Sequence, residues 1–247
     1  ARSHFGSRAW PPGANEVLPG ICRGAMGDGE ERVPPGTYTI TNEGGEQIRS
    51  IGFNGTAKAE YANGDVYEGS FKDGARHGKG KYTYFSGDVF DGTFDSNLKV
   101  GLGMVTYAKG GFFHGHFKDG LREGEGTFKY ANGDIYSGMW KSGKKHGKGT
   151  YVFNRTKYEY KGDWKDGQIT RGTWSLRDRF KYIGGFQSQK PCGDGVWETS
   201  QGSIVEGAYV QQVVPIDAEP PAPPGGTPAT RTKTFWKTAT MVAKEEE

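Results

Sequence analysis

The chain has little of what stabilises most compact or secreted domains. Hydrophobic residues make up 33% of its 247 residues, against about 45–50% in a typical soluble domain. Its two cysteines, Cys22 and Cys192, are too few for a disulfide framework. It contains no apolar run near the roughly 20 residues that span a bilayer. The net charge of +3 does not by itself indicate a nucleic-acid partner.

Glycine and aromatic residues are abundant instead. There are 42 glycines, more than twice the usual share of about 7%. Aromatic residues reach 13%, whereas a disordered chain would be poor in them. Apolar burial must therefore depend on large rings, and the glycines must serve backbone geometry.

These residues recur with a period of 23. Tyr67–Gly74 (YEGSFKDG) is followed by His-Gly-Lys-Gly at 77–80 and by two tyrosines. We expect six full repeats with an atypical fragment at each end, as is typical of capping repeats. The repeats begin at Tyr67, Phe90, Phe113, Tyr136, Tyr160 and Tyr182.

The pattern within a repeat predicts a β-hairpin. Tyr67, Gly69 and Phe71 alternate with polar residues, which indicates a strand with one apolar face. A second strand follows over 80–84, after a turn expected over 73–78. Asn-Gly between repeats is a strong hairpin signal, so successive hairpins should pair into an antiparallel meander of about 13 strands. A ring from a neighbouring strand can lie over each strand glycine.

The repeats resemble the MORN family, whose pattern is Tyr-x-Gly-x-Phe/Trp-x-x-Gly-x-x-His-Gly-x-Gly. The repeats at Tyr67 and Tyr136 match nearly every position, whereas others, among them the second, fifth and sixth, lack the histidine. The resemblance covers about 53–209 and implies an all-β fold, a single-layer elongated antiparallel meander.

Comparable sets of MORN repeats occur in radial-spoke-head and other axonemal proteins, in junctional membrane proteins, in plant lipid kinases and in parasite cytoskeletal proteins. The resemblance implies a non-enzymatic scaffold that binds other protein subunits of a large complex. It also implies a cytoplasmic location in the cytoskeleton, at the axoneme of a cilium or flagellum. An organellar or cytoskeletal complex scaffold is the alternative within this class.

Composition divides the chain into four parts: an irregular extension at 1–52, the repeat sheet at 53–210, a Pro/Gly linker at 211–230 and a docking tail at 231–247. A short strand is expected at Thr37–Thr41. The first ten residues faintly resemble the end of a transit peptide, although an irregular tail is the favoured interpretation. Phe235 and Trp236 in the last part either anchor a partner or fold back on the sheet.

The sequence predicts no catalytic, cofactor-binding or metal-binding residues. The glycine spacing at 143–150 does not fit a phosphate-binding loop. His114 and His116 share a strand face, but zinc needs three or four ligands. Asp65, Asp88 and Asp134 recur after turn glycines and are interpreted as turn formers.

The aromatic face is the expected partner site, because a single-layer sheet has no second layer to cover its rings. Rings of the repeats and of the tail make up this site: Tyr67, Phe71, Tyr84, Phe113, Phe117, Tyr136, Trp140, Tyr160, Trp164, Trp174, Phe235 and Trp236.

Two further modes of association follow from the sequence. The open edges of the sheet allow self-association. Basic hairpin ends allow binding to a phosphoinositide or another anionic membrane lipid, although acidic residues lie at similar turns. The basic residues are Lys141, Lys144, Lys145 and Lys148 on one hairpin, and Arg76, Lys79 and Lys81 on another.

Overall fold

The structure, a computed structural model, describes residues 38–177, 179–215 and 230–242. These residues form seventeen strands in an open antiparallel meander, which confirms the predicted all-β fold. The described part of the chain contains no helix, so no helix there could cross a membrane. Predictions about 1–37, 216–229 and 243–247 lie outside the described residues.

The strands fall into two compact units, which are described separately. The N-terminal unit comprises 21–155 and 165–167, and the C-terminal unit includes Thr156–Trp164 and Gln168 onward. The N-terminal unit holds β1 (Thr39–Asn42), β2 (Gln47–Arg49), β3 (Gly55–Glu60), β4 (Val66–Lys72), β5 (Ala75–Thr83), β6 (Val89–Asp95), β7 (Leu98–Thr106), β8 (Phe112–Lys118), β9 (Leu121–Lys129), β10 (Ile135–Lys141) and β11 (Lys144–Val152). The C-terminal unit holds β12 (Glu159–Lys165), β13 (Gln168–Leu176), β14 (Phe180–Gln187), β15 (Lys190–Thr199), β16 (Ile204–Pro215) and β17 (Thr230–Val242).

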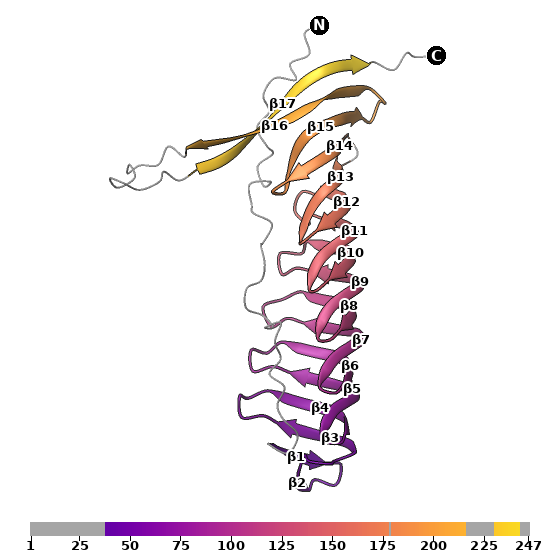
Figure 1. Cartoon of the computed structure of the whole chain (residues 1–247), viewed down its shortest axis with the longest axis vertical. Coiled ribbons are helices and arrows are strands. Elements are labelled where there is room, and N and C mark those ends of the chain that lie inside the picture. The colour runs from indigo at the N-terminus through magenta and orange to yellow at the C-terminus, as the bar shows by residue number, and fades with distance from the viewer. Residues whose placement is uncertain (1–37, 178, 216–229, 243–247) are drawn as a thin grey trace, which may run out of the picture. The chain divides into compact units, whose positions relative to one another are not determined.

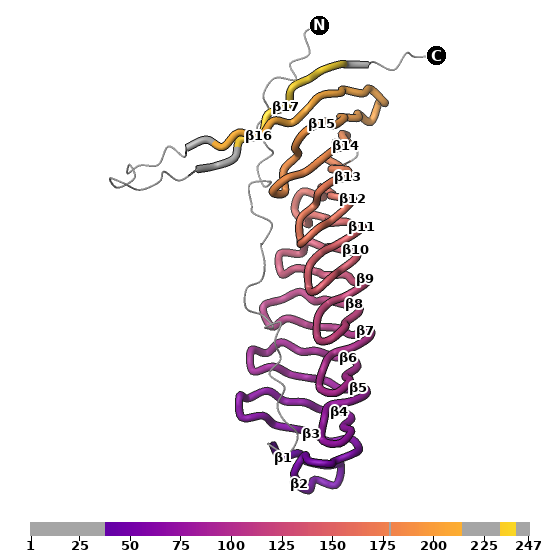
Figure 2. Tube along the Cα trace, viewed as in Figure 1, coloured from indigo at the N-terminus to yellow at the C-terminus, as the bar shows by residue number. Residues whose placement is uncertain are grey.

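Within the N-terminal unit, hairpins follow one another along the sheet (Figure 1). β1 overlaps the short strand expected at 37–41 and pairs with both β2 and β3. From β3 to β11, consecutive strands pair antiparallel with one another. The trace in Figure 2 shows the same hairpin recurring from β4 to β11, as the repeat period predicts.

Each hairpin bends at a pair of facing glycines. In β4 and β5, Gly69 lies opposite Gly80, and a bulge then shifts the register so that Phe71 faces Arg76. The turn expected over 73–78 was too long, because β5 already begins at Ala75. Gly78 keeps its positive φ of 73° inside that strand as part of the bulge, and the bulge bends the strand.

Aromatic rings lie over these glycines, as predicted. A Cβ atom at Gly80 would sit 2.5 Å from Cζ of Tyr67, and one at Gly126 would sit 2.6 Å from Cζ of Phe113. Only a residue without a side chain leaves room for the ring. The bend and the glycines together fold each strand pair around its own aromatic side chain.

Backbone and aspartate hydrogen bonds join successive repeats. The turn amides of Asn97 and Gly120 donate to the carbonyl oxygens of Arg76 and Lys99, one repeat earlier, at 3.0 Å each. Asp134 accepts hydrogen bonds from the hydroxyl of Tyr151 at 2.8 Å and from the amide of residue 154 at 2.7 Å. The aspartates are therefore turn formers, as interpreted from the sequence, and they also tie one turn to the next.

The C-terminal unit ends in a long hairpin of β16 and β17. The pairing runs from Ile204, opposite Val242, to Pro215, opposite Thr230. β15 pairs only with the first part of β16, up to Tyr209. β16 thus extends into the segment that the sequence assigned to a linker starting at 211, and the expected tail forms most of β17.

Candidate binding surfaces

Nine of the twelve predicted partner-binding rings are buried within the sheet itself. Tyr67, Phe113 and Tyr136 are 0% exposed, and the other six are no more than 6% exposed: Phe71, Phe117, Trp140, Tyr160, Trp164 and Trp174. The predicted reason for a partner site on this face was therefore wrong, because the curled single layer covers its own rings. Contact of these nine rings with a partner remains a prediction.

The buried rings form a ladder of edge-to-face contacts. Phe113 packs against Phe117 at a centroid distance of 5.3 Å and against Trp140 of the next repeat at 5.2 Å. Phe90 packs against Phe117 at 5.1 Å. Such pairs contribute about 0.5–1.5 kcal/mol each beyond the area they bury. The ladder holds each repeat to the next.

A second row of rings is only half-buried. Tyr84, Tyr107, Tyr130 and Phe153 each lie 17 residues after the first ring of a repeat. They stack beside the buried rings, as Tyr130 does on Phe128 at 4.3 Å. We call these four residues the outer ring row. Only Tyr84 was among the predicted site residues, although the repeat position itself marks the other three.

A row of cations runs beside these rings. Arg76, Lys99, Arg122 and Lys145 each lie nine residues after the first ring of a repeat, and we call them the cation row. Each lies over aromatic rings; the shortest distance from its charged group to a ring centroid is 4.8, 5.4, 4.7 and 4.9 Å respectively. Sequence reasoning missed this row because charged residues normally lie on the solvent face of a strand.

Burial differs along the cation row. Arg76 and Lys99 are 2% and 4% exposed, whereas Arg122 and Lys145 are half-buried. Arg122 donates a hydrogen bond to the carbonyl oxygen of Gly143 at 3.0 Å. Burial lowers the pKa of Lys145 to about 8, because a low-dielectric site disfavours the charged form. An arginine stays charged throughout the ordinary pH range.

The cation row corrects part of the membrane-binding expectation. Arg76 and Lys145 were counted as basic hairpin ends, but both point among the rings. Of the basic residues expected at those two hairpin ends, the structure leaves Lys79, Lys81, Lys141, Lys144 and Lys148 exposed.

The same repeat position is apolar in the C-terminal unit. Ile169 and Pro191 each lie nine residues after their repeat's first ring, at Tyr160 and Tyr182, and both are buried. Tyr160 and Tyr182 are themselves buried, so this unit keeps its first rings but not the cations. Among the described residues, the cation row is confined to the N-terminal unit.

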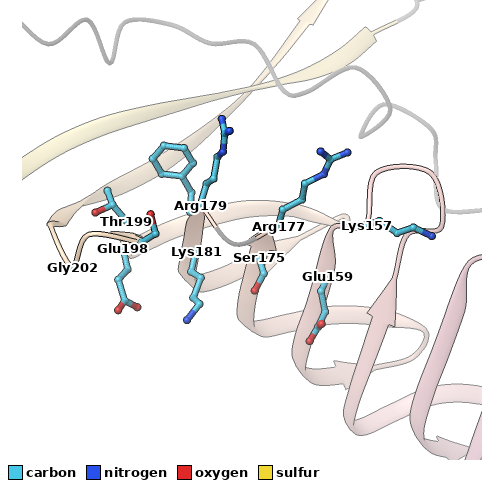
Figure 3. A pocket seen from close by; sticks show the side chains of 11 residues that line it. Lys157, Glu159, Ser175, Arg177, Arg179, Lys181, Glu198, Thr199 and Gly202 are labelled. Carbon is cyan, nitrogen blue, oxygen red and sulfur yellow. The ribbon is translucent and has the colours of Figure 1, made fainter.

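The C-terminal unit has a polar depression of about 490 Å³. It is lined by Lys157, Arg177, Arg179 and Lys181, together with Glu159 and Glu198 among others. Figure 3 shows Arg177 and Arg179 pointing to the same side. The guanidinium of Arg177 donates to the carbonyl oxygen of Thr156 at 3.2 Å. Because both basic and acidic side chains line the depression, it can hold a small anion only weakly.

The tail residues divide between the two expected roles. Trp236 packs on Tyr209 at 5.0 Å and on Tyr182 at 6.2 Å, so it folds back on the sheet. Phe235 lies opposite Val210 and is 46% exposed, which leaves its role as an anchor open.

The described residues hold no group of three or more His, Cys, Asp or Glu arranged for a metal ion. His114 and His116 lie opposite Met104 and Leu102 on an exposed sheet face. His77 instead pairs with Asp95 at 3.3 Å. The glycine-rich segment at 143–150 runs from a turn into β11, so it forms no phosphate-binding loop.

Comparison with known proteins detects MORN repeats in the chain. The MORN repeat model matches residues 67–89, 90–112, 113–135, 136–155 and 160–170. These five matches begin at five of the six expected repeat starts. None of the curated proteins matches the chain significantly.

Two solved structures are examples of those that match this chain. One is the TCP domain of SAS-4 (dCPAP) of Drosophila melanogaster, in complex with a proline-rich motif of Ana2 (dSTIL); it has 17% identity, a TM-score of 0.42, and coverage of 76% of this chain and 97% of that one. The other is the wild-type TCP10 domain of Danio rerio CPAP, with 13% identity, a TM-score of 0.25 and coverage of 68% and 92%. Because both TM-scores are below 0.5, neither supports a functional argument.

Proposed function

We propose that this MORN-repeat chain is a non-enzymatic scaffold that binds other protein subunits of a large ciliary or flagellar assembly, such as the radial spoke of the axoneme. The outer ring row is the observation that carries the proposal. Four half-buried rings recur in register on one unit, beside four cations. Aromatic and arginine side chains are the groups that contribute most at protein interfaces. The resemblance to axonemal repeat proteins supports the location.

Cross-linking mass spectrometry on isolated axonemes tests both parts of this proposal. The tagged full chain should cross-link to a small, reproducible set of axonemal subunits. Replacing Tyr107 and Tyr130 with serine should reduce those cross-links several-fold, because the half-buried rings supply the contact.

A matched control lies on the opposite face of the same unit. Leu102 and Met104 are 53% and 42% exposed, and replacing both with serine should leave the cross-links unchanged. Equal losses in the two double variants would refute the assignment of the partner surface. Absence of the wild-type chain from axonemal fractions would refute the location.

Membrane tethering is the second candidate, and the exposed lysines of β10 and β11 favour it. Lys141, Lys144 and Lys148 lie on one hairpin, and each basic residue near an anionic surface contributes about 1 kcal/mol. Co-sedimentation with vesicles containing phosphoinositide would support this role if it is lost when the three lysines become glutamine. Equal sedimentation with neutral vesicles would exclude it.

A further inference from the structure

We infer that the free edge of β17 binds an extended acidic segment of a partner protein as an added β-strand. In that strand an apolar residue lies opposite Phe235, and the residues two positions to either side of it are acidic. This edge belongs to the C-terminal unit and is a different surface from the outer ring row. The inference goes beyond the proposed function, because a strand can bind this edge whatever assembly the chain belongs to.

The edge is long and open. β17 has 13 residues and pairs with β16 from end to end on one side. No strand in the described part of the chain pairs with its other side, where backbone N–H and C=O groups can accept a further strand. Edge strands are usually kept short, as β2 is in the N-terminal unit with only three residues. A long open edge is the template for recognition by strand addition.

One face of β17 is basic with an apolar centre. Lys233, Phe235 and Lys237 alternate with Thr234 and Trp236, so these three side chains share a face of the sheet. Both lysines are exposed, and Phe235 is 46% exposed. Neither lysine has an ion-pair partner among the residues that the structure describes. β17 contains no Asp or Glu, so an added strand with two carboxylates would complement this face.

Phe235 sets the position of the apolar residue in the added strand. It lies opposite Val210 of β16, which is 39% exposed on the same face. A valine opposite Phe235 on a third strand would extend this apolar pair, and aromatic–β-branched pairs stabilise a sheet. Trp236 points to the other face, where it packs on Tyr209 at 5.0 Å. That packing holds β17 in place for a third strand.

The charges also disfavour the alternative occupant, which is β17 of a second copy. Pairing two β17 strands brings basic side chains together with no acidic residue on either strand. Like charges opposite one another are destabilising, whereas opposite charges stabilise the pairing. The order acidic, apolar, acidic at alternate positions is the same in both chain directions. It therefore suits an added strand that runs either way along β17.

Fluorescence anisotropy with labelled synthetic peptides tests the inference on the full chain. The probe is Thr-Thr-Glu-Thr-Val-Thr-Glu-Thr-Thr, and the comparison peptide, Thr-Thr-Thr-Glu-Glu-Val-Thr-Thr-Thr, has the same composition with the glutamates adjacent. We expect the probe to bind about fivefold more tightly, because both of its glutamates share a face with the valine. Equal affinity for the two peptides would overturn the inference, because it would show that only net charge is sensed.

N-methylated probes test whether the peptide binds as a strand. One version is methylated at the amides of alternate residues, and a second version at the remaining amides. Alternate amides of a strand point to opposite edges, so one version should bind about tenfold more weakly and the other should bind like the probe. Unchanged affinity of both versions would overturn strand addition, because no backbone amide of the peptide would then be needed.

Charge-reversal variants locate the edge. Lys233→Glu and Lys237→Glu should each weaken binding of the probe about fivefold. The double variant should instead bind the peptide in which both glutamates are replaced by lysine. Lys161→Glu is the matched control, since Lys161 is an exposed lysine of β12 in the same unit. An equal loss with Lys161→Glu would overturn the site.

Hydrogen exchange on the unmutated chain gives a readout that needs no variant. The probe should slow amide exchange in β17 several-fold and leave β4 and β5 unchanged, and protection confined to the N-terminal unit would overturn the inference. It also fails if a peptide with the sequence of residues 230–242 binds as tightly as the probe, because the edge then pairs with a second copy. If the probe does not bind while Lys233→Glu and Lys237→Glu abolish sedimentation with anionic vesicles, the face is a lipid site and the inference fails.

Discussion

Replacing Gly149 with alanine should destabilise the hairpin of β10 and β11 although it removes no contact. A Cβ atom at this position would lie 2.6 Å from Cζ and 2.7 Å from Cε2 of Tyr136. Carbon atoms normally approach to about 3.5–4.0 Å, so the ring must move by about 1 Å. The backbone of Gly149 does not have a positive φ, so the cost arises from the clash alone.

The ring of Tyr136 has nowhere to move. It is 0% exposed, packs edge-to-face on Trp140 at 5.3 Å, and its hydroxyl donates to the carbonyl oxygen of Met139 at 3.0 Å. Overpacking a core costs about 1–3 kcal/mol, and loss of the hydrogen bond adds about 0.5–1.5 kcal/mol. We expect Gly149→Ala to cost about 2–4 kcal/mol in local stability.

Hydrogen exchange measured by mass spectrometry is the appropriate assay, because each repeat contacts only its neighbours and the loss should be local. Peptides from β10 and β11 should exchange faster, whereas those from β4 and β5 should not change. Gly120→Ala is a useful control: its φ is 84° and nothing lies within 4 Å of the added Cβ, so only the backbone cost of about 1–2 kcal/mol applies.

Tyr136→Leu separates the clash from other effects. Once the ring is gone, adding Gly149→Ala should cost much less than it does in the parent chain, giving a coupling of about 1 kcal/mol or more. Two results would refute the claim that Gly149 is needed to make room for the Tyr136 ring. One is a cost below about 0.5 kcal/mol for Gly149→Ala in the parent, and the other is strict additivity of the two changes.

Three other changes probe the remaining features of the fold. Asp134→Ala removes the acceptor of Tyr151 and of a turn amide and should cost about 2–3 kcal/mol in urea unfolding. The pKa of Lys145 falls from 10.5 to about 8 on folding, so the unfolded chain binds more protons between those values, and wild-type stability should rise with pH through that window. That rise should total on the order of 3 kcal/mol, and Lys145→Ile should remove it; equal pH profiles would contradict the burial. Trp236→Ala removes the packing on Tyr209 and should speed hydrogen exchange in β16 and β17 without changing the N-terminal unit.

The sequence was sufficient to predict the repeat, the strand alternation and the rings over glycines. Each of these is local, since Tyr67, Gly69 and Phe71 lie within five positions of one another and recur with a fixed period. The bend in β5 was not predicted. The sequence around Gly78 is typical of a turn, and the bulge there depends on the register with the partner strand β4. That bend is what buries the rings.

Two features of the candidate sites were beyond sequence reasoning for a different reason. Lys99 lies in a strand where it would ordinarily face solvent, and only the three-dimensional packing places it over a ring. β17 carries no repeat signature, so nothing local indicated that Trp236 would pair across from Tyr209. Pairing between distant segments costs loop-closure entropy, which the pairing must offset before it stabilises the fold. Composition does not encode the register of such a pairing.

The two units show that the fold itself does not require the cation row. Ile169 and Pro191 occupy the same repeat position as Arg76 and Lys145, and both are buried in the same kind of hairpin. Replacing buried charges with well-packed apolar residues is often neutral or stabilising. In the N-terminal unit the two arginines of the row also join repeats, because Arg76 and Arg122 donate hydrogen bonds to the carbonyl oxygens of Asn97 and Gly143 at 3.0 Å each. Converting Lys99 and Lys145 to isoleucine should accordingly preserve the hairpins, and unchanged hydrogen exchange in β6, β7, β10 and β11 would confirm that the cations are not required for the fold.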